Sequence, residues 1–356
     1  MEKKQYYDGS KLLSLKDING QKPEIYMCTS NRAAGKTTFF NRLLVKRFLQ
    51  QRKKFGLIYR YNTDMVSPHE RFFKEIQALF FPDWGMASAW DGKQFIRMYL
   101  FPKGKEKEKS EWMECGYCFS INQAEKIKNF AHLFSDVSAL LFEEFQLESG
   151  NYIPGELLKF QSLHSSVARG GGKQSRYVPV YMLSNLLTML NPYYAAFGVS
   201  ERLRDDTQFL RGDGWVLEQT WNEAAASAAA DSAFNRAFGA GLYTKSLTEK
   251  IYLHDSKTFI ERPKGRSNYL ATLKVEGTEY GIREYPATGL IYCDDSPDST
   301  YPLKLAVTTE DHNINFVMLR QNPMFISNLR YYFERGAFRF KNLSCKAAVL
   351  KTLSYW

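Results

Sequence analysis

Apolar runs alternate with helical patterns through the first part of the chain, up to about residue 205. Short apolar runs typical of buried strands cover Glu24–Cys28, Phe55–Tyr61, Val137–Phe142 and Val178–Leu183. From Thr37 to Gln51 the large apolar side chains instead recur at helical spacing, at Phe40, Leu43, Leu44 and Phe48. Alternating strands and helices predict an α/β domain at 1–205, with a mostly parallel sheet flanked by helices.

The pattern changes after this first domain. An alanine-rich run, NEAAASAAADSAFNRAFGAGL, is typical of helix, and we predict a helical linker at 206–255. Beyond it, NYLATLKV, TEYGIREY, GLIYCDD and PLKLAVTT are strand-like, and FISNLRYYFERG and KNLSCKAAVLKTL are helix-like. This order predicts a second, smaller α/β domain at 256–356.

Length and cysteine content agree with a two-domain protein of a reducing compartment. A chain of 356 residues exceeds what one hydrophobic core usually organises. The five cysteines are too scattered for a disulfide framework. Cys115 and Cys118 form a CxxC pair, but the sequence has no second such pair. We interpret them as strand residues rather than as a zinc or redox site.

Charge and hydropathy narrow the possible partners. The net charge of +10 favours a polyanionic partner, either nucleic acid or a membrane surface. No stretch approaches the ~20 apolar residues that a membrane span needs. The opening segment, MEKKQYYDGS, lacks the apolar region of a secretory signal. We therefore expect an intracellular protein that is not secreted and has no membrane partner.

The strongest chemical signal is SNRAAGKT, from Ser30 to Thr37, between the first predicted strand and its helix. It fits the Walker A pattern except that Ser30 replaces the first glycine. The amides of such a loop bind phosphate oxygens, the Lys36 ammonium neutralises them, and the Thr37 hydroxyl binds Mg²⁺. The predicted ATP-binding residues are Ser30, Asn31, Arg32, Ala33, Ala34, Gly35, Lys36, Thr37, Thr38 and Arg60.

Two further strands end in residues suited to ATP hydrolysis. The run VSALLFEE ends in Glu143, which we expect to bind the metal with Thr37, and Glu144, which we expect to act as the base that polarises water. The run VPVYMLSN ends at Asn185, a candidate sensor of the γ-phosphate between the two Walker strands. These features indicate the additional-strand, catalytic-glutamate division of P-loop ATPases, with ATP and Mg²⁺ as cofactors.

Fast hydrolysis also needs a cation near the γ-phosphate, supplied by the same chain or by a neighbouring subunit. The candidates are Arg32, Arg60, Arg169 and Arg176. Arg169 opens the glycine-rich stretch ARGGGKQSR, which has the backbone freedom to reach across a subunit interface. Contact with DNA phosphate is the other interpretation of Arg169.

Several longer motifs carry a family resemblance. They are SINQAEK at 120–126, LLFEEF, NYIPGEL at 151–157, SNLLTMLNPYY at 184–194, GLIYCDDSPDSTYPLKLAVTTED at 289–311 and RYYFERGAFRFKN at 330–342. With them, the sequence resembles the DNA-packaging (encapsidation) ATPases of small podoviruses of the Picovirinae type. It differs from their usual pattern in having Glu143 in place of Asp and Ser30 in place of Gly.

The resemblance implies a homomeric, pentameric ring that moves double-stranded DNA into the procapsid. The ring would sit on the viral portal (connector), directly or through an RNA or protein adaptor, in the cytoplasm of the infected bacterial host. It implies Lys36 and Thr37 as the Walker A pair, Glu144 as catalytic, Arg169 as a trans-acting arginine finger, and Lys126 as a second interface cation. The C-terminal domain resembles a vestigial RNase H-like nuclease.

Three alternatives remain at this stage. The same core occurs in other P-loop translocases and helicases, which would act on single strands through base-stacking aromatics. A degenerate P-loop would leave a portal-binding protein without ATP turnover. Asp294 and Asp295 end a predicted strand and invite a nuclease interpretation, although a two-metal nuclease needs acids converging from several strands.

Overall fold

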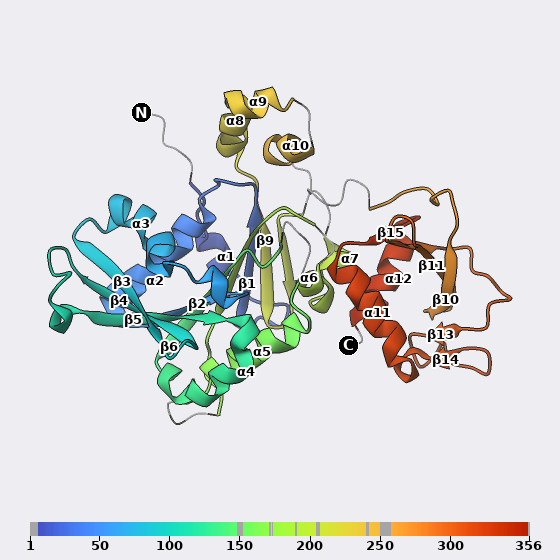
Figure 1. The fold of residues 1–356 in the computed structure, drawn as a ribbon, viewed down its shortest axis with the longest axis horizontal. Coiled ribbons are helices and arrows are strands. Elements are labelled where there is room, and N and C mark those ends of the chain that lie inside the picture. Colours follow the sequence, from blue (N-terminus) through green and yellow to red (C-terminus); the bar gives the residue numbers. More distant parts are fainter. Residues whose placement is uncertain are drawn as a thin grey trace. The chain divides into compact units, whose positions relative to one another are not determined.

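A computed structural model describes residues 6–147, 152–170, 172, 174–188, 191–203, 207–239, 242–249 and 258–354 (Figure 1). The described residues fall into two compact units. The first unit combines the chain up to Phe145 with Ile153–Asn185 and Thr207–Glu249. The second unit combines Gln146–Tyr152, Leu186–Asp206 and Lys250–Trp356.

The first unit is built on a nine-stranded sheet of order β3-β4-β5-β2-β6-β7-β1-β9-β8. Its strands are β1 Ile25–Ser30, β2 Lys54–Tyr59, β3 Trp84–Asp91, β4 Phe95–Pro102, β5 Met113–Ser120, β6 Val137–Glu143, β7 Val180–Asn185, β8 Phe209–Gly212 and β9 Trp215–Gln219. The strands from β5 to β9 in this order are parallel, and β3, β4 and β8 add antiparallel edges. The predicted mostly parallel α/β sheet is confirmed.

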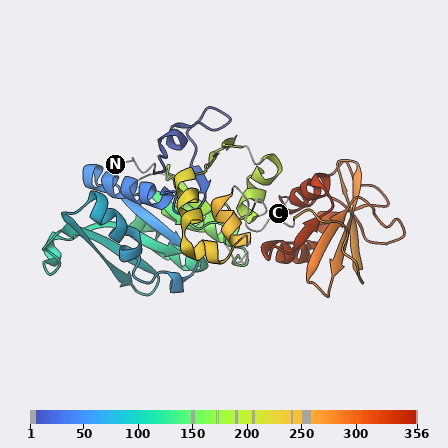
Figure 2. The same cartoon turned by 90° about the horizontal axis from the view of Figure 1, so that it is seen from above.

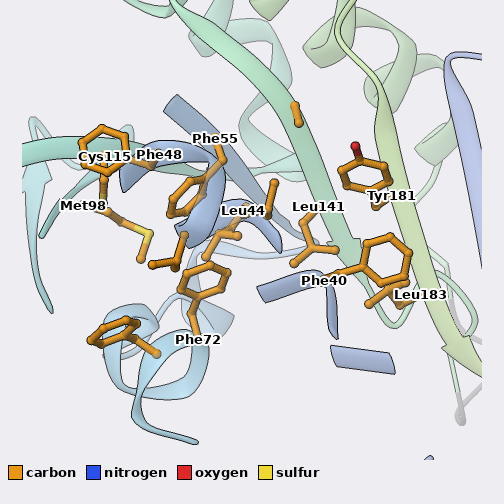
Figure 3. Close-up of a cluster of buried hydrophobic side chains, with 14 of the residues drawn as sticks. Phe40, Leu44, Phe48, Phe55, Phe72, Met98, Cys115, Leu141, Tyr181 and Leu183 are labelled. Atoms are coloured by element: carbon orange, nitrogen blue, oxygen red, sulfur yellow. The ribbon is translucent and has the colours of Figure 1, made fainter. Parts of the chain in front are cut away.

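Helices flank this sheet, as the alternating pattern predicted. The helices of the first unit are α1 Ser10–Ser14, α2 Lys36–Gln51, α3 Pro68–Phe80, α4 Ala124–Ile127, α5 Glu156–Val167, α8 Glu223–Asp231, α9 Ala233–Ala237 and α10 Leu242–Thr248. Helix α2 packs Phe40, Leu44 and Phe48 into the same core as Leu141 of β6 and Tyr181 of β7 (Figure 3). The helical face predicted between Thr37 and Gln51 is therefore the face that anchors α2 to the sheet.

The prediction of a helical linker at 206–255 is wrong in its first part. Strands β8 and β9 form a hairpin there, and β9 pairs in parallel with β1. The turn contains Asp213 and Gly214, and Gly214 has a φ of 72°. Asp-Gly between apolar runs is a strong hairpin signal, which the alanine-rich run that follows obscured. Helices α8, α9 and α10 confirm the helical part.

Domain boundaries also differ from the predicted 1–205 and 256–356. Leu186–Asp206 belongs to the second unit, where it forms α6 Pro192–Ala196 and α7 Val199–Arg202. Ala195 of α6 packs into the hydrophobic core of that unit. The predicted junction LHDSKTF lies largely outside the described residues.

The second unit is a six-stranded mixed sheet of order β14-β13-β10-β11-β12-β15. Its strands are β10 Asn268–Val275, β11 Thr278–Tyr285, β12 Leu290–Asp294, β13 Lys304–Ala306, β14 Val317–Met318 and β15 Phe338–Phe340. Helices α11 Pro323–Glu334 and α12 Leu343–Ser354 lie on one side of this sheet (Figure 2). The predicted strands and helices of a C-terminal α/β domain are confirmed. Across the described residues, every helix is too short or too polar to cross a bilayer.

Two adjacent phenylalanines in α2 test the packing of the first unit. Phe40 is fully buried, whereas Phe39 is only partly buried. Phe40→Ala should lower the free energy of unfolding by about 3–5 kcal/mol, because it leaves a cavity between α2 and the sheet. Phe39→Ala, the matched control, should cost clearly less. Thermal unfolding of both variants checks this, and equal losses would contradict the packing described.

Candidate functional site

A short loop, the predicted phosphate loop, joins the end of β1 to the start of α2. Strand β1 ends at Ser30 and α2 begins at Lys36, so the amides of the first helical turn face the loop between them. Gly35 has a φ of 94°, a left-handed conformation that glycine adopts without strain. Exposed amides and the helix dipole together favour an anion at this position.

The loop borders a pocket of about 530 Å³ in the first unit, a size typical of small-molecule sites. The predicted residues that line it are Arg32, Ala33, Ala34, Gly35, Lys36, Thr37, Thr38, Glu143, Glu144 and Asn185. Tyr6, Glu75, Leu183 and Ser184 complete the lining. The tertiary structure therefore brings the loop, the acidic pair and the sensor candidate to one cavity.

Lys36 is buried at the base of this pocket. Its Nζ donates to Ser30 Oγ at 2.6 Å, and it lies 3.2 Å from the Asn31 carbonyl oxygen. Burial first, and then the neighbouring Arg32 charge, lower the pKa of Lys36 to about 8. An incoming phosphate would favour the charged ammonium. Ser30, in place of the usual glycine, thus supplies a hydroxyl that accepts a hydrogen bond from the buried lysine.

Glu143 and Thr37, which we predicted as metal ligands, both line the pocket. Burial and then the neighbouring Glu144 charge raise the pKa of the Glu143 carboxyl group to about 7, whereas the nearby Thr37 hydroxyl lowers it. Among the described residues, the buried Glu143 Oε1 has no hydrogen-bond partner. A carboxylate oxygen without a partner beside a hydroxyl is a donor set that suits a hard cation such as Mg²⁺. The extra methylene of Glu143 therefore does not displace the acid from the pocket.

Glu144 occupies the pocket edge in a left-handed conformation, with a φ of 55°. Its backbone carbonyl accepts a hydrogen bond from Arg60 Nη1. Arg60 Nη2 also donates to the Phe145 carbonyl at 2.6 Å and forms an ion pair with Glu156 at 2.9 Å. Arg60, predicted to bind ATP, does not line the pocket. It instead holds the backbone that carries the catalytic candidate.

Asn185 ends β7, which lies between β6 and β1 as predicted. Its Cα is in register with that of Ser30, so it faces the start of the phosphate loop.

The remaining candidate cations lie away from this pocket. Arg169 follows α5 and Lys126 lies on α4, and both are exposed and outside the pocket lining. The Arg176 guanidinium donates hydrogen bonds to the backbone carbonyl oxygens of Phe134, Val137 and Val167.

Asn222 is a residue that the sequence interpretation missed. The Asn31 amide group donates to the Asn222 carbonyl at 2.9 Å, and the Asn222 backbone N–H donates back to Asn31 Oδ1 at 2.9 Å. The Asn222 side chain also caps α8 by accepting from the Ala225 N–H. Asparagine before EAAAS is a recognisable helix N-cap, but its contact with the phosphate loop spans almost two hundred positions. The local sequence carried no signal for that contact.

The acids of the second unit do not form a metal site. Asp294 pairs with Arg283 at 3.2 Å, and Asp295 pairs with Lys341. No group of three or more potential metal ligands occurs among the described residues. This arrangement gives the nuclease alternative no ligand set. Cys115 and Cys118 are buried residues of β5, as predicted.

A mostly parallel sheet with a phosphate loop after β1 and an acidic pair at the end of β6 defines a P-loop nucleotide-binding protein. Residues 1–354 match the family described as Podovirus DNA encapsidation protein (Gp16), and the chain belongs to that family. The predicted family is thus confirmed.

Individual relatives cover nearly the whole chain. The DNA packaging protein of Bacillus phage phi29 is 23% identical over 359 aligned residues, covering 100% of this chain and 97% of the relative. Among solved structures, the phi29 genome packaging motor assembly is 22% identical with a TM-score of 0.53, covering 99% and 98% of the two chains. The Phi-28 gp11 DNA packaging motor is 14% identical with a TM-score of 0.56, covering 99% and 97%. These structural similarities support the fold.

The raised pKa of Glu143 predicts a pH-dependent stability. Its folded-state pKa of about 7 exceeds the ordinary value of 4.5, so folding is favoured by the protonated form. This contribution is present below pH 4.5 and is lost as pH rises through 7. Glu143→Gln should therefore gain stability relative to wild type between pH 5 and pH 8, by several degrees in Tm. Metal-free thermal unfolding at both pH values checks this; a pH-independent difference would contradict it.

Proposed function

We propose that this protein is an ATP-driven motor that moves double-stranded genomic DNA into a phage procapsid. The observation that carries the proposal is the convergence of Lys36, Thr37, Glu143 and Glu144 on one pocket. Because the chain belongs to the DNA encapsidation family, we infer that ATP hydrolysis at this site drives DNA packaging. The net charge of +10 suits a partner whose phosphates are contacted irrespective of base sequence.

In the proposed reaction, the loop amides and Lys36 hold the triphosphate. Thr37 and Glu143 would hold Mg²⁺, which supplies charge neutralisation at the β- and γ-phosphates when bound. Glu144, at the open edge of the pocket, accepts a proton from the attacking water. Asn185 contacts the γ-phosphate from the neighbouring strand. Arg60 positions the Glu144 backbone and takes no part in binding the nucleotide.

The cation that completes the site comes from the next subunit of a ring. Arg169 and Lys126 are exposed and lie outside the pocket of their own chain, which suits residues that act on a neighbour. Helix α5 links the Arg60 cluster, which holds the Glu144 backbone, to Arg169. It begins at Glu156, the ion-pair partner of Arg60, and ends just before Arg169. We propose a pentameric ring docked on the portal, directly or through an RNA or protein adaptor, in the host cytoplasm and transiently on the procapsid.

The first test is ATP hydrolysis with and without double-stranded DNA. Wild-type protein should show DNA-stimulated turnover, and Glu144→Gln should reduce it at least about a hundredfold, because general-base catalysis contributes roughly that much. The variant should still bind ATP, since Lys36 and Thr37 are intact. Stimulation by single strands alone would favour a helicase, and no turnover by wild type with DNA and procapsids would favour a non-hydrolysing portal protein.

A mixing experiment tests the trans role of Arg169. Glu144→Gln and Arg169→Ala proteins should each be inactive, but their mixture should regain activity. In mixed rings, an intact Glu144 of one subunit can face an intact Arg169 of the next. Arg211→Ala, which removes an exposed arginine of β8 outside the pocket lining, is the control and should retain activity by itself. If the mixture stayed inactive while mixed rings formed, Arg169 would not act across the interface.

A further inference from the structure

Tyr6 is the one aromatic side chain among the described residues that line the nucleotide pocket. Its ring lies over the phosphate loop, with Cδ1 3.3 Å from where a Cβ would stand on Gly35. The side chain is nevertheless 59% exposed. A large aromatic that covers the loop while keeping most of its surface open is a platform for a flat ligand rather than a core residue.

The neighbouring residue, Tyr7, fixes this platform to the site. The Tyr7 N–H donates to the Ala34 carbonyl at 2.9 Å, which ties the segment to the phosphate loop. The Tyr7 hydroxyl donates to Glu218 Oε2 at 2.5 Å, which ties it to β9. The Tyr7 ring stacks on Phe40 of α2. Tyr6 is thus held beside the loop by three separate contacts of its neighbour.

The remaining lining suits a triphosphate but not a base. Lys36, Thr37 and the two glutamates are charged or polar, and Leu183 is only 2% exposed. A nucleotide base is flat and largely apolar, and it binds well against an aromatic face. Arg32 also lines the pocket, and its planar guanidinium lies 5.7 Å from the Tyr243 ring of α10. Planar cations of this kind stack on bases as well.

We propose that Tyr6 stacks on the base of the bound nucleoside triphosphate and so separates ATP from phosphate compounds that lack a base. This inference rests on the proposed ATPase function, because it assigns the base subsite of that same pocket. The alternative is that Tyr6 only covers Gly35 and stabilises the loop. A ligand without a base distinguishes the two, since it needs the loop but not the platform.

The experiment measures the KM for ATP and the inhibition constant of inorganic tripolyphosphate in wild type, Tyr6→Ala and Tyr6→Phe. Tyr6→Ala should raise the KM for ATP about tenfold, the typical effect of one lost stacking contact. Its kcat and its inhibition by tripolyphosphate should stay as in wild type. Tyr6→Phe, which keeps the ring, should restore the wild-type KM.

Tyr331→Ala serves as the matched control, because Tyr331 is 51% exposed and lies outside the pocket lining. It should leave both constants unchanged. An unchanged KM in Tyr6→Ala, or a loss of ATP and tripolyphosphate affinity by the same factor, would overturn the base-stacking role. Either result leaves the ATPase proposal standing if wild type turns over ATP and Glu144→Gln does not.

Discussion

The buried ammonium of Lys36 is the constraint on which the site depends. A buried charge is costly unless hydrogen-bond partners surround it. Here Ser30 Oγ and the Asn31 carbonyl meet that need, and both belong to the end of β1 and the turn that follows. Lys36 is also the first residue of α2, whose apolar face packs on the sheet. Its charge, its loop and its helix therefore cannot shift independently, which keeps the phosphate loop in shape before any ligand binds.

A second buried charge organises the turn that carries Glu144. The Arg60–Glu156 pair is almost fully enclosed, and such pairs contribute little net stability because both ions lose their hydration. The ion pair instead fixes the position of Arg60, which also donates to the backbone carbonyls of Glu144 and Phe145. This cluster fixes the turn that presents Glu144 and joins it to α5. Helix α5 begins at Glu156 and ends at Val167, so this cluster and Arg169 lie at opposite ends of the same helix.

The second unit uses its acids for structure rather than for metal binding. Asp294 is held by Arg283 within the sheet, so a carboxylate at a strand end has become half of an ion pair. The two units thus differ in chemistry: the P-loop unit keeps Glu143 Oε1 without a described partner, and the second unit neutralises its strand-end acid.

Local patterns were sufficient to predict several central elements and to indicate the Walker residues. Apolar runs identify β1, β6 and β7, helical spacing identifies α2, and SNRAAGKT with VSALLFEE identifies the site, because each signal lies within a few consecutive residues. The tertiary structure alone decided which distant residues meet. Pairing of β9 with β1 brings Asn222 to Asn31, Arg60 turns to the Glu144 backbone instead of the nucleotide, and Tyr6 covers Gly35. These contacts depend on strand order and on side-chain direction in three dimensions, which no local spacing encodes.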